Sequence, residues 1–340
     1  MTRRMIATLC GLVAAFANPI AAASASAQQA RPRVVLAVDG IGQTRNLPVL
    51  VAERLHYFTD AGLTVTLVEA PAEPSVEALV ADGRADGAVA FYHHTFMTQT
   101  DLKLVTQAVV VMGASPQLKL VVAERLRDTV KTVADLKGRK IFVGGANSGK
   151  TTTMNWLALR AGMRNDDYAA LTPTTPTAMM QALRDRSADA IIAHEPDVER
   201  YLASGAAYVL ADVNSVDGTK KALGAPYPST ALYLPAAYIA AHPDEVQKLV
   251  NACVRALTYI NSHSAAEIAA ILPPKVVGSN NAAFVKMLAD DKLAFATDGR
   301  LPIEAARQQL DVMTALSPKY KSVTFAQTYT NRFVERVPAR

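Results

Sequence analysis

The sequence contains few cysteines, few aromatic side chains and few charges. Two of its 340 residues are cysteine, and aromatic and charged residues make up 6% and 19% of the chain. The charges are scattered without a polybasic run, which argues against nucleic acid as a partner. Beyond the N-terminus no apolar run reaches the roughly 20 residues of a spanning helix, so we expect no stable membrane insertion. The length and the 50% hydrophobic content indicate a globular chain of about two domains.

The N-terminus has the pattern of an export signal. Two arginines precede an apolar segment from Met5 to Ala17, and Ala25-Ser26-Ala27 fits the small-residue cleavage pattern. We therefore predict that residues 1–27 are removed on export and that the mature protein is periplasmic. Cys10 leaves with this segment, so only Cys253 remains and no internal disulfide can form. Loss of the two arginines lowers the net charge from +5 to +3, which is compatible with a small anionic ligand.

Strand and helix patterns alternate along the mature chain, which predicts the α/β class with parallel sheets. Buried strands are expected at 33–38, 63–68, 87–91, 102–111, 118–123, 139–143, 189–193 and 230–234. Helices are expected between Leu47 and Gly62, at 75–82, 150–161, 177–184 and 198–203, and over most of the chain from Asp244 onward.

Three short motifs carry a family resemblance. The step Asp82-Gly83-Arg84-Ala85-Asp86 lies between a predicted helix and a strand, and a similar step runs from Arg184 to Asp189. Asp135-Leu136-Lys137-Gly138 precedes another strand. In this order the motifs resemble the solute-binding proteins of ABC importers, in particular the nitrate, sulfonate and taurine family. That family also contains binders of the pyrimidine precursor of thiamine, and the resemblance covers roughly residues 34–257.

The resemblance implies a type II periplasmic-binding fold, in which two α/β lobes are joined by two crossing strands. It places the first lobe at 31–117 and 226–335, and the second at 118–225. It also implies a small-molecule ligand held by lobe closure and an ABC transporter permease as partner. We expect a monomer without a cofactor.

The segment from Gly144 to Thr151 is a candidate anion site. It matches the nucleotide pattern G-x-x-x-x-G-K-[ST], but ATP is scarce outside the cytoplasm, which argues against nucleotide hydrolysis. Backbone N–H groups at a helix start favour an anionic group in any case, whereas the plainer alternative is that the glycines only permit a tight turn. We predict ligand contacts from Gly145, Asn147, Ser148, Gly149 and Thr151.

Three of the six histidines follow predicted strands at ends that face one cleft. Tyr92, His93 and His94 follow one strand, and His194 and Glu195 follow the matching strand in the other half. An imidazole can donate to an oxyanion and a tyrosine can stack on a flat ligand, so we predict that all five contact the ligand. Zinc binding is the rival interpretation. Adjacent histidines seldom point the same way, so we predict no metal site; exposed or locally hydrogen-bonded histidines are the plainer alternative.

Four further residues complete the predicted ligand contacts. Gln43 and Thr44 precede the first helix, and Ser115 and Tyr227 lie near the expected crossing strands. No nucleophile elbow G-x-S-x-G and no metalloprotease helix is present, so we predict no enzyme and no catalytic residue. The prediction is a protein that captures a small anionic organic solute, such as a sulfonate or carboxylate. A thiamine-precursor binder, a periplasmic enzyme and a metal-capture protein using the same cleft remain alternatives.

Overall fold

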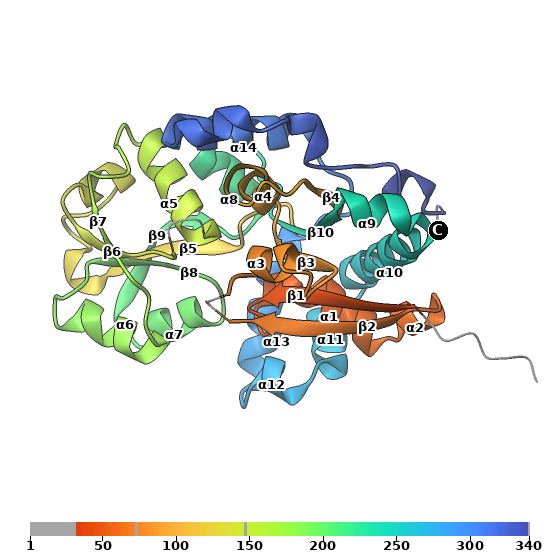
Figure 1. The fold of residues 1–340 in the computed structure, drawn as a ribbon. Coiled ribbons are helices and arrows are strands. Elements are labelled where there is room, and N and C mark those ends of the chain that lie inside the picture. The colour runs from red at the N-terminus through yellow and green to blue at the C-terminus, as the bar shows by residue number, and fades with distance from the viewer. Residues whose placement is uncertain (1–31, 72–73, 146–147, 339–340) are drawn as a thin grey trace, which may run out of the picture. The chain divides into compact units, whose positions relative to one another are not determined.

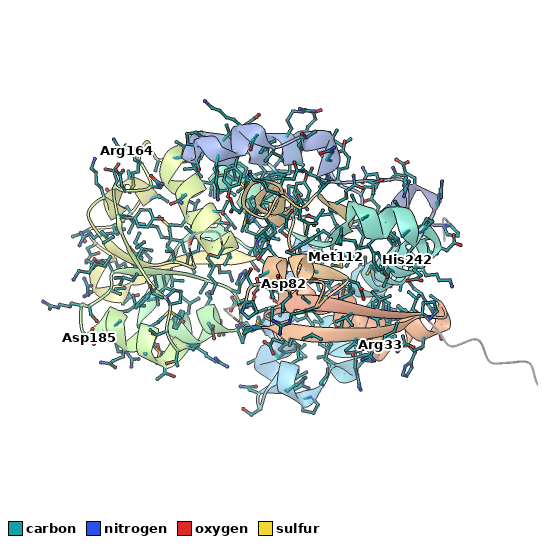
Figure 2. All side chains as sticks on the ribbon, viewed as in Figure 1. Arg33, Asp82, Met112, Arg164, Asp185 and His242 are labelled. Carbon is teal, nitrogen blue, oxygen red and sulfur yellow. The ribbon has the colours of Figure 1, made fainter. Side chains whose placement is uncertain are left out.

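The computed structural model describes residues 32–71, 74–145 and 148–338, which all belong to one compact unit. The predicted signal segment and Asn147 lie outside the described residues. Figure 2 shows the charged side chains of Arg33, Arg164 and Asp185 pointing outward, whereas Met112 is fully buried.

The first of two five-stranded sheets has the strand order β2-β1-β3-β10-β4 (Figure 1). Its strands are β1 (Arg33–Asp39), β2 (Thr64–Ala70), β3 (Gly87–Phe91), β4 (Thr106–Val111) and β10 (Thr230–Pro235). β1 pairs in parallel with β2 and β3, whereas β10 returns from far along the chain and is antiparallel to β3 and β4. The inner strands are continuous apolar runs because helices cover both faces of the sheet.

Helices on the two faces of this sheet come from distant parts of the chain. One face packs against α1 (Leu47–Arg54), α2 (Tyr57–Asp60), α10 (Pro243–Ser262), α11 (Ala265–Ile271), α12 (Pro274–Val277) and α13 (Asn281–Asp291), and α9 (Ala236–Ala241) follows β10. The other face packs against α3 (Val76–Ala81), α4 (His94–Asp101) and α14 (Ile303–Leu316). Cys253 is fully buried on α10, and burial raises the pKa of its thiol to about 12, which fits an inert core residue.

The second sheet has the order β7-β6-β8-β5-β9. Its strands are β5 (Leu118–Ala123), β6 (Lys140–Phe142), β7 (Ala169–Leu171), β8 (Ala190–Ala193) and β9 (Ala207–Val213), and its helices are α5 (Gly149–Arg160), α6 (Pro176–Arg184), α7 (Asp197–Ala203) and α8 (Val216–Leu223). β5 is antiparallel to β8 and β9, so each sheet contains one strand that runs against its parallel neighbours. The predicted α/β class is confirmed, and the lobe boundaries stay a prediction.

Two local predictions are wrong, and the helix α4, which begins at His94, was not predicted. Residues 102–105 are not a strand, since β4 begins at Thr106. The expected helix between Leu47 and Gly62 is interrupted at His56, whose φ of 60° is left-handed. The β-branched and polar residues of α4 have low intrinsic helix propensity, and burial of Phe96 against the first sheet overrides it. The strands β7 and β9 and the helix α8 were not predicted.

Candidate ligand-binding site

The candidate site gathers around the ring of Phe91 at the end of β3. Phe91 is 2% exposed, and its ring centre lies 5.5, 6.2 and 6.1 Å from the ring centres of His93, His94 and His194. The guanidinium carbon of Arg45 lies 5.1 Å from the centre of the same ring. We call these five residues the Phe91 cluster. Because His194 follows β8 of the second sheet, the cluster joins residues from both sheets.

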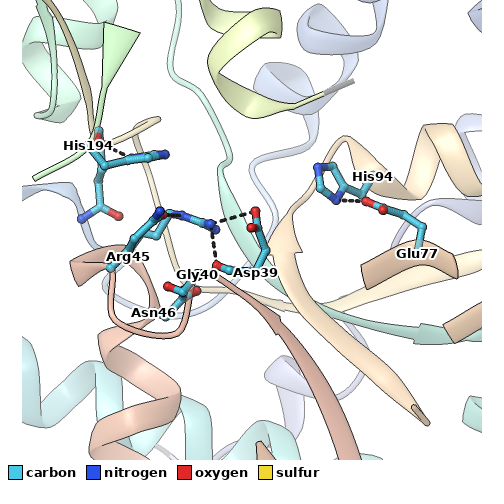
Figure 3. A network of polar contacts seen from close by, with 9 residues as sticks. Asp39, Gly40, Arg45, Asn46, Glu77, His94 and His194 are labelled. Atoms are coloured by element: carbon cyan, nitrogen blue, oxygen red, sulfur yellow. Dashed lines mark hydrogen bonds and ion pairs between the residues drawn. The ribbon is translucent and has the colours of Figure 1, made fainter. Parts of the chain in front are cut away.

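Arg45 is held in place by the loop that follows β1 (Figure 3). Its Nη2 donates to the Asp39 carboxylate at 2.8 Å and to the Asp39 carbonyl at 2.6 Å, and its Nε donates to Oε1 of Gln43 at 2.7 Å. Asn46 ties the loop by donating to the carbonyls of Asp39 and Gly40. The Arg45 guanidinium keeps the pKa of the Asp39 carboxyl below its ordinary value.

One nitrogen of this guanidinium, Nη1, makes none of these hydrogen bonds. Arg45 is 2% exposed, and its Nη1 has no hydrogen-bond partner among the described residues. A buried donor without a partner costs free energy, and a charged donor costs more than a neutral one. The position therefore favours an acceptor that carries negative charge.

His94 is paired with a carboxylate on the neighbouring helix. Its Nδ1 contacts Oε1 of Glu77 of α3, and both side chains are 7% exposed. Burial alone would raise the pKa of Glu77, but the imidazole beside it lowers the pKa to about 2. Figure 3 shows this pair beyond Asp39, on the side away from His194.

His194 lies on the other side of Arg45 and is 6% exposed. Its Nδ1 lies 2.8 Å from the main-chain oxygen of Gln117. Burial, and then the positive charges of Arg45 and Lys150, lower the pKa of His194 well below its ordinary value. Burial and Arg45 also lower the pKa of Lys150. Burial and the two neighbouring cations therefore keep His194 uncharged at neutral pH.

The helix α5 brings its N-terminus against Phe91. A Cβ on Gly149 would lie 2.4 Å from carbons of the Phe91 ring, so only glycine permits this approach. Ser148 caps the helix by accepting from the Thr151 N–H at 3.2 Å, and Thr151 Oγ1 donates to the Gly145 carbonyl at 2.8 Å. The hydroxyls of Ser148 and Thr151 thus hold the loop, while the helix end favours negative charge beside it.

Two other predicted residues belong to a separate group, which we call the Asp291 network. Thr44 Oγ1 donates to one oxygen of Asp291 at 2.5 Å, and Asn214 Nδ2 donates to the other at 2.7 Å. Ser115 Oγ donates to the Asn214 carbonyl at 2.9 Å. Asp291 is 1% exposed, and burial raises its pKa to about 6. This network links α13 and the loop after β1 to the segment before β5, which holds Ser115, and to the segment after β9, which holds Asn214.

The remaining predicted contacts lie at or beyond the edge of the site. Glu195 pairs with Lys119 at 3.0 Å. Tyr92 is fully buried on the opposite side of the chain from Phe91, with its hydroxyl 2.7 Å from that of Thr328. Tyr227 is fully buried in the core of the second sheet. Contacts of these residues with a ligand remain predictions, as do those of the whole predicted set.

Sequence reasoning missed Arg45, Phe91 and Gln117. Gln117 has a left-handed φ of 54°, which is uncommon for a residue other than glycine. It is 2% exposed, and both atoms of its side-chain amide lack a partner among the described residues. No sequence motif marks these residues. The signal that points to Arg45 is its position in a loop directly after a buried strand.

The two adjacent histidines do not present their rings in the same direction. The rings of His93 and His94 are 4.8 Å apart and nearly perpendicular, at 79°. Within residues 32–71, 74–145 and 148–338, no group of three or more His, Cys, Asp or Glu side chains is arranged to hold a metal ion.

In the same ranges, no helix combines the length and apolarity needed to cross a membrane.

Comparison with known proteins identifies the fold and the family. No functionally curated protein matches the sequence. A solved structure from Bordetella bronchiseptica RB50 is 28% identical with a TM-score of 0.80, over 90% of this chain and 96% of that one. The periplasmic aliphatic sulphonate binding protein SsuA from Escherichia coli is 19% identical with a TM-score of 0.65, over 86% of this chain and 94% of that one. The desulfurization enzyme DSZB is 14% identical with a TM-score of 0.62, over 90% of this chain and 99% of that one.

The two more distant structures show that the chain has the periplasmic-binding-protein fold, as predicted, and that binding proteins and an enzyme share this fold. The predicted resemblance is confirmed by the family comparison. The model of the family described as NMT1/THI5 like matches residues 43–266, and the chain therefore belongs to the NMT1/THI5-like family.

Proposed function

We propose that this chain is the periplasmic substrate-binding subunit of an ABC importer, which captures a small organic anion and delivers it to a membrane permease. The observation that carries the proposal is the Phe91 cluster. In it the unpartnered nitrogen of Arg45 lies beside an aromatic ring that also contacts the N-terminus of α5. A cation, a helix N-terminus and an aromatic face together suit a sulfonate or carboxylate with an apolar body. Membership of the family and the sulphonate-binding relative support this choice.

The charges around the cluster favour an anion over a neutral solute. Arg45 and Lys150 both act on His194 by their positive charge and lower its pKa. Asp39 offsets part of the charge of Arg45, but no described carboxylate bonds to Nη1 of that residue. A bound anion would therefore pair with a nitrogen that is already buried, without displacing an existing partner.

Binding requires the cluster to open. Each of its five residues, taken as a whole, is at most 6% exposed. The ring of Phe91 in the first sheet closes directly onto Gly149 at the start of α5 in the second. We propose an open form in which these two segments separate, and a ligand that shifts the population toward the closed form because it contacts both. The protein acts as a monomer.

The experiment is a thermal-shift screen of sulfonates, carboxylates, nitrate and pyrimidines, followed by calorimetry with the best ligand. Arg45→Gln should weaken binding of an anion by about tenfold or more, because a charge-assisted hydrogen bond is lost. The matched control is Arg164→Gln, which removes the same charge from a side chain that is 78% exposed. An Arg45→Gln protein that folds and binds the anion with unchanged affinity would refute the site.

Two other functions follow from specific observations. The family also suggests a pyrimidine binder, for which a neutral pyrimidine should be the best ligand and Arg45→Gln should have little effect. The fold shared with a desulfurization enzyme suggests catalysis in the same cleft. Ligand recovered chemically unchanged after long incubation with the protein supports binding alone, and turnover would refute it.

A further inference from the structure

The proton on the His194 ring is placed by its main-chain contact. Nδ1 lies 2.8 Å from the carbonyl oxygen of Gln117, and a carbonyl oxygen can only accept a hydrogen bond. Nδ1 therefore carries the hydrogen. A neutral imidazole has one hydrogen, so Nε2 is left with a lone pair.

The positive charges around His194 keep the ring neutral. Arg45 and Lys150 both disfavour a second proton, and burial disfavours it further. No described residue other than Gln117 hydrogen-bonds the ring. His194 is 6% exposed, and its ring lies 6.1 Å from that of Phe91, so the lone pair is part of the Phe91 cluster.

We propose that Nε2 of His194 accepts a hydrogen bond from an N–H or O–H group of the ligand, so that the ligand is an organic anion that also carries a donor. This inference rests on the proposed function and narrows its substrate class. Arg45 Nη1 donates to the anionic group, and His194 accepts from a second group on the same molecule. The sequence alone predicts the opposite role for His194, that of an imidazole that donates to an oxyanion. Its pairing with Gln117 rules out that role for the neutral ring.

The affinity of a ligand should therefore depend on whether it carries a hydrogen-bond donor rather than on its size. His194 is 6% exposed, so a ligand without the donor leaves its lone pair with neither a ligand partner nor full solvation. Sites built for a hydrogen bond reject such analogues strongly. Suitable probes are 2-hydroxyethanesulfonate, its methyl ether 2-methoxyethanesulfonate, and ethanesulfonate. A second set is 4-hydroxybenzoate, 4-methoxybenzoate and benzoate. In each set the anionic group is constant while the donor is present, blocked or absent.

Calorimetry with the wild-type protein should show that a hydroxyl probe binds at least about tenfold more tightly than its two analogues. His194→Phe should remove this preference, so that a hydroxyl probe and its two analogues bind this variant with similar affinities. His242→Phe is the control, since His242 is about half exposed and lies outside the Phe91 cluster. Equal affinities for hydroxyl probes and analogues in the wild-type protein would overturn the inference and leave the proposed function intact. Failure of every anion to bind would count against the proposed function itself.

Nitrogen–proton NMR of histidine-labelled protein tests the tautomer without any ligand. The His194 signals are assigned from their loss in His194→Gln. A proton on Nδ1 and none on Nε2 supports the inference. A proton on Nε2 overturns it, even in a protein that binds anions.

Discussion

Replacement of Asp291 by asparagine should stabilise the protein at neutral pH. The carboxyl is 1% exposed, and burial raises its pKa from 3.8 to about 6, against the effect of its two hydrogen bonds. An acid whose pKa is raised by folding contributes stability below its unfolded pKa, and this is lost as the pH rises through the folded value. A shift of this size corresponds to about 3 kcal/mol of unfolding free energy at neutral pH. Asparagine keeps an oxygen acceptor for Thr44 or Asn214 and removes the buried charge.

Urea unfolding of both proteins at about pH 5 and about pH 8 measures the effect. The unfolding free energy of wild type relative to Asp291→Asn should fall by about 1.4 kcal/mol between these two pH values, since Asp291 is only partly ionised at the lower one. Asp290→Asn is the matched control, because Asp290 is the exposed neighbour on the same helix. A free-energy difference between wild type and Asp291→Asn that does not change with pH would show that Asp291 does not titrate in the folded protein, and would refute the reasoning.

Three further substitutions test a packing contact, an ion pair and a helix cap at the site. Gly149→Ala should weaken ligand binding about tenfold or more by calorimetry, because its Cβ would overlap the Phe91 ring, and an unchanged affinity would contradict this. Glu77→Gln should lower the unfolding free energy by about 3 kcal/mol at neutral pH, a loss that shrinks as the pH falls below about 4.5 because the pKa of this carboxyl is lowered in the folded state. Ser148→Ala should destabilise by about 1 kcal/mol in urea unfolding through loss of the helix cap. An unchanged unfolding free energy would contradict either of the last two.

Much of the fold could be predicted because strands that are buried on both faces are continuous apolar runs. The segments at 33–38, 87–91 and 118–123 were found in this way, and α10 was found from its stripe at helical spacing. The helix α4 was missed because its residues favour other conformations when taken alone. Its helical form depends on packing against a sheet assembled from distant strands, which a local pattern does not contain.

The site was only partly predictable for a similar reason. Glycine-rich loops and strand ends are local signals, and they led to Gly149 and to His194, which the structure brings to the same ring. Arg45 has only its position in the loop after β1 as a local signal, and Gln117 has none. Their importance comes from which atoms they meet: Arg45 meets Phe91, and the main chain of Gln117 meets His194 across a long sequence separation.

Unpartnered polar groups in and beside the Phe91 cluster affect the free energy of the proposed lobe closure. In the structure, which the proposed function assigns to the closed form, Nη1 of Arg45 and the side-chain amide of Gln117 are buried with no partner among the described residues. Each such group raises the free energy of that form by an amount of order 1–3 kcal/mol relative to an open form in which water solvates it. A ligand that pairs with them removes this cost only when the protein closes, so closure becomes favourable mainly with ligand present. Under the proposed function, the polar groups that lower the stability of the empty closed form are therefore the same ones that make closure depend on the ligand.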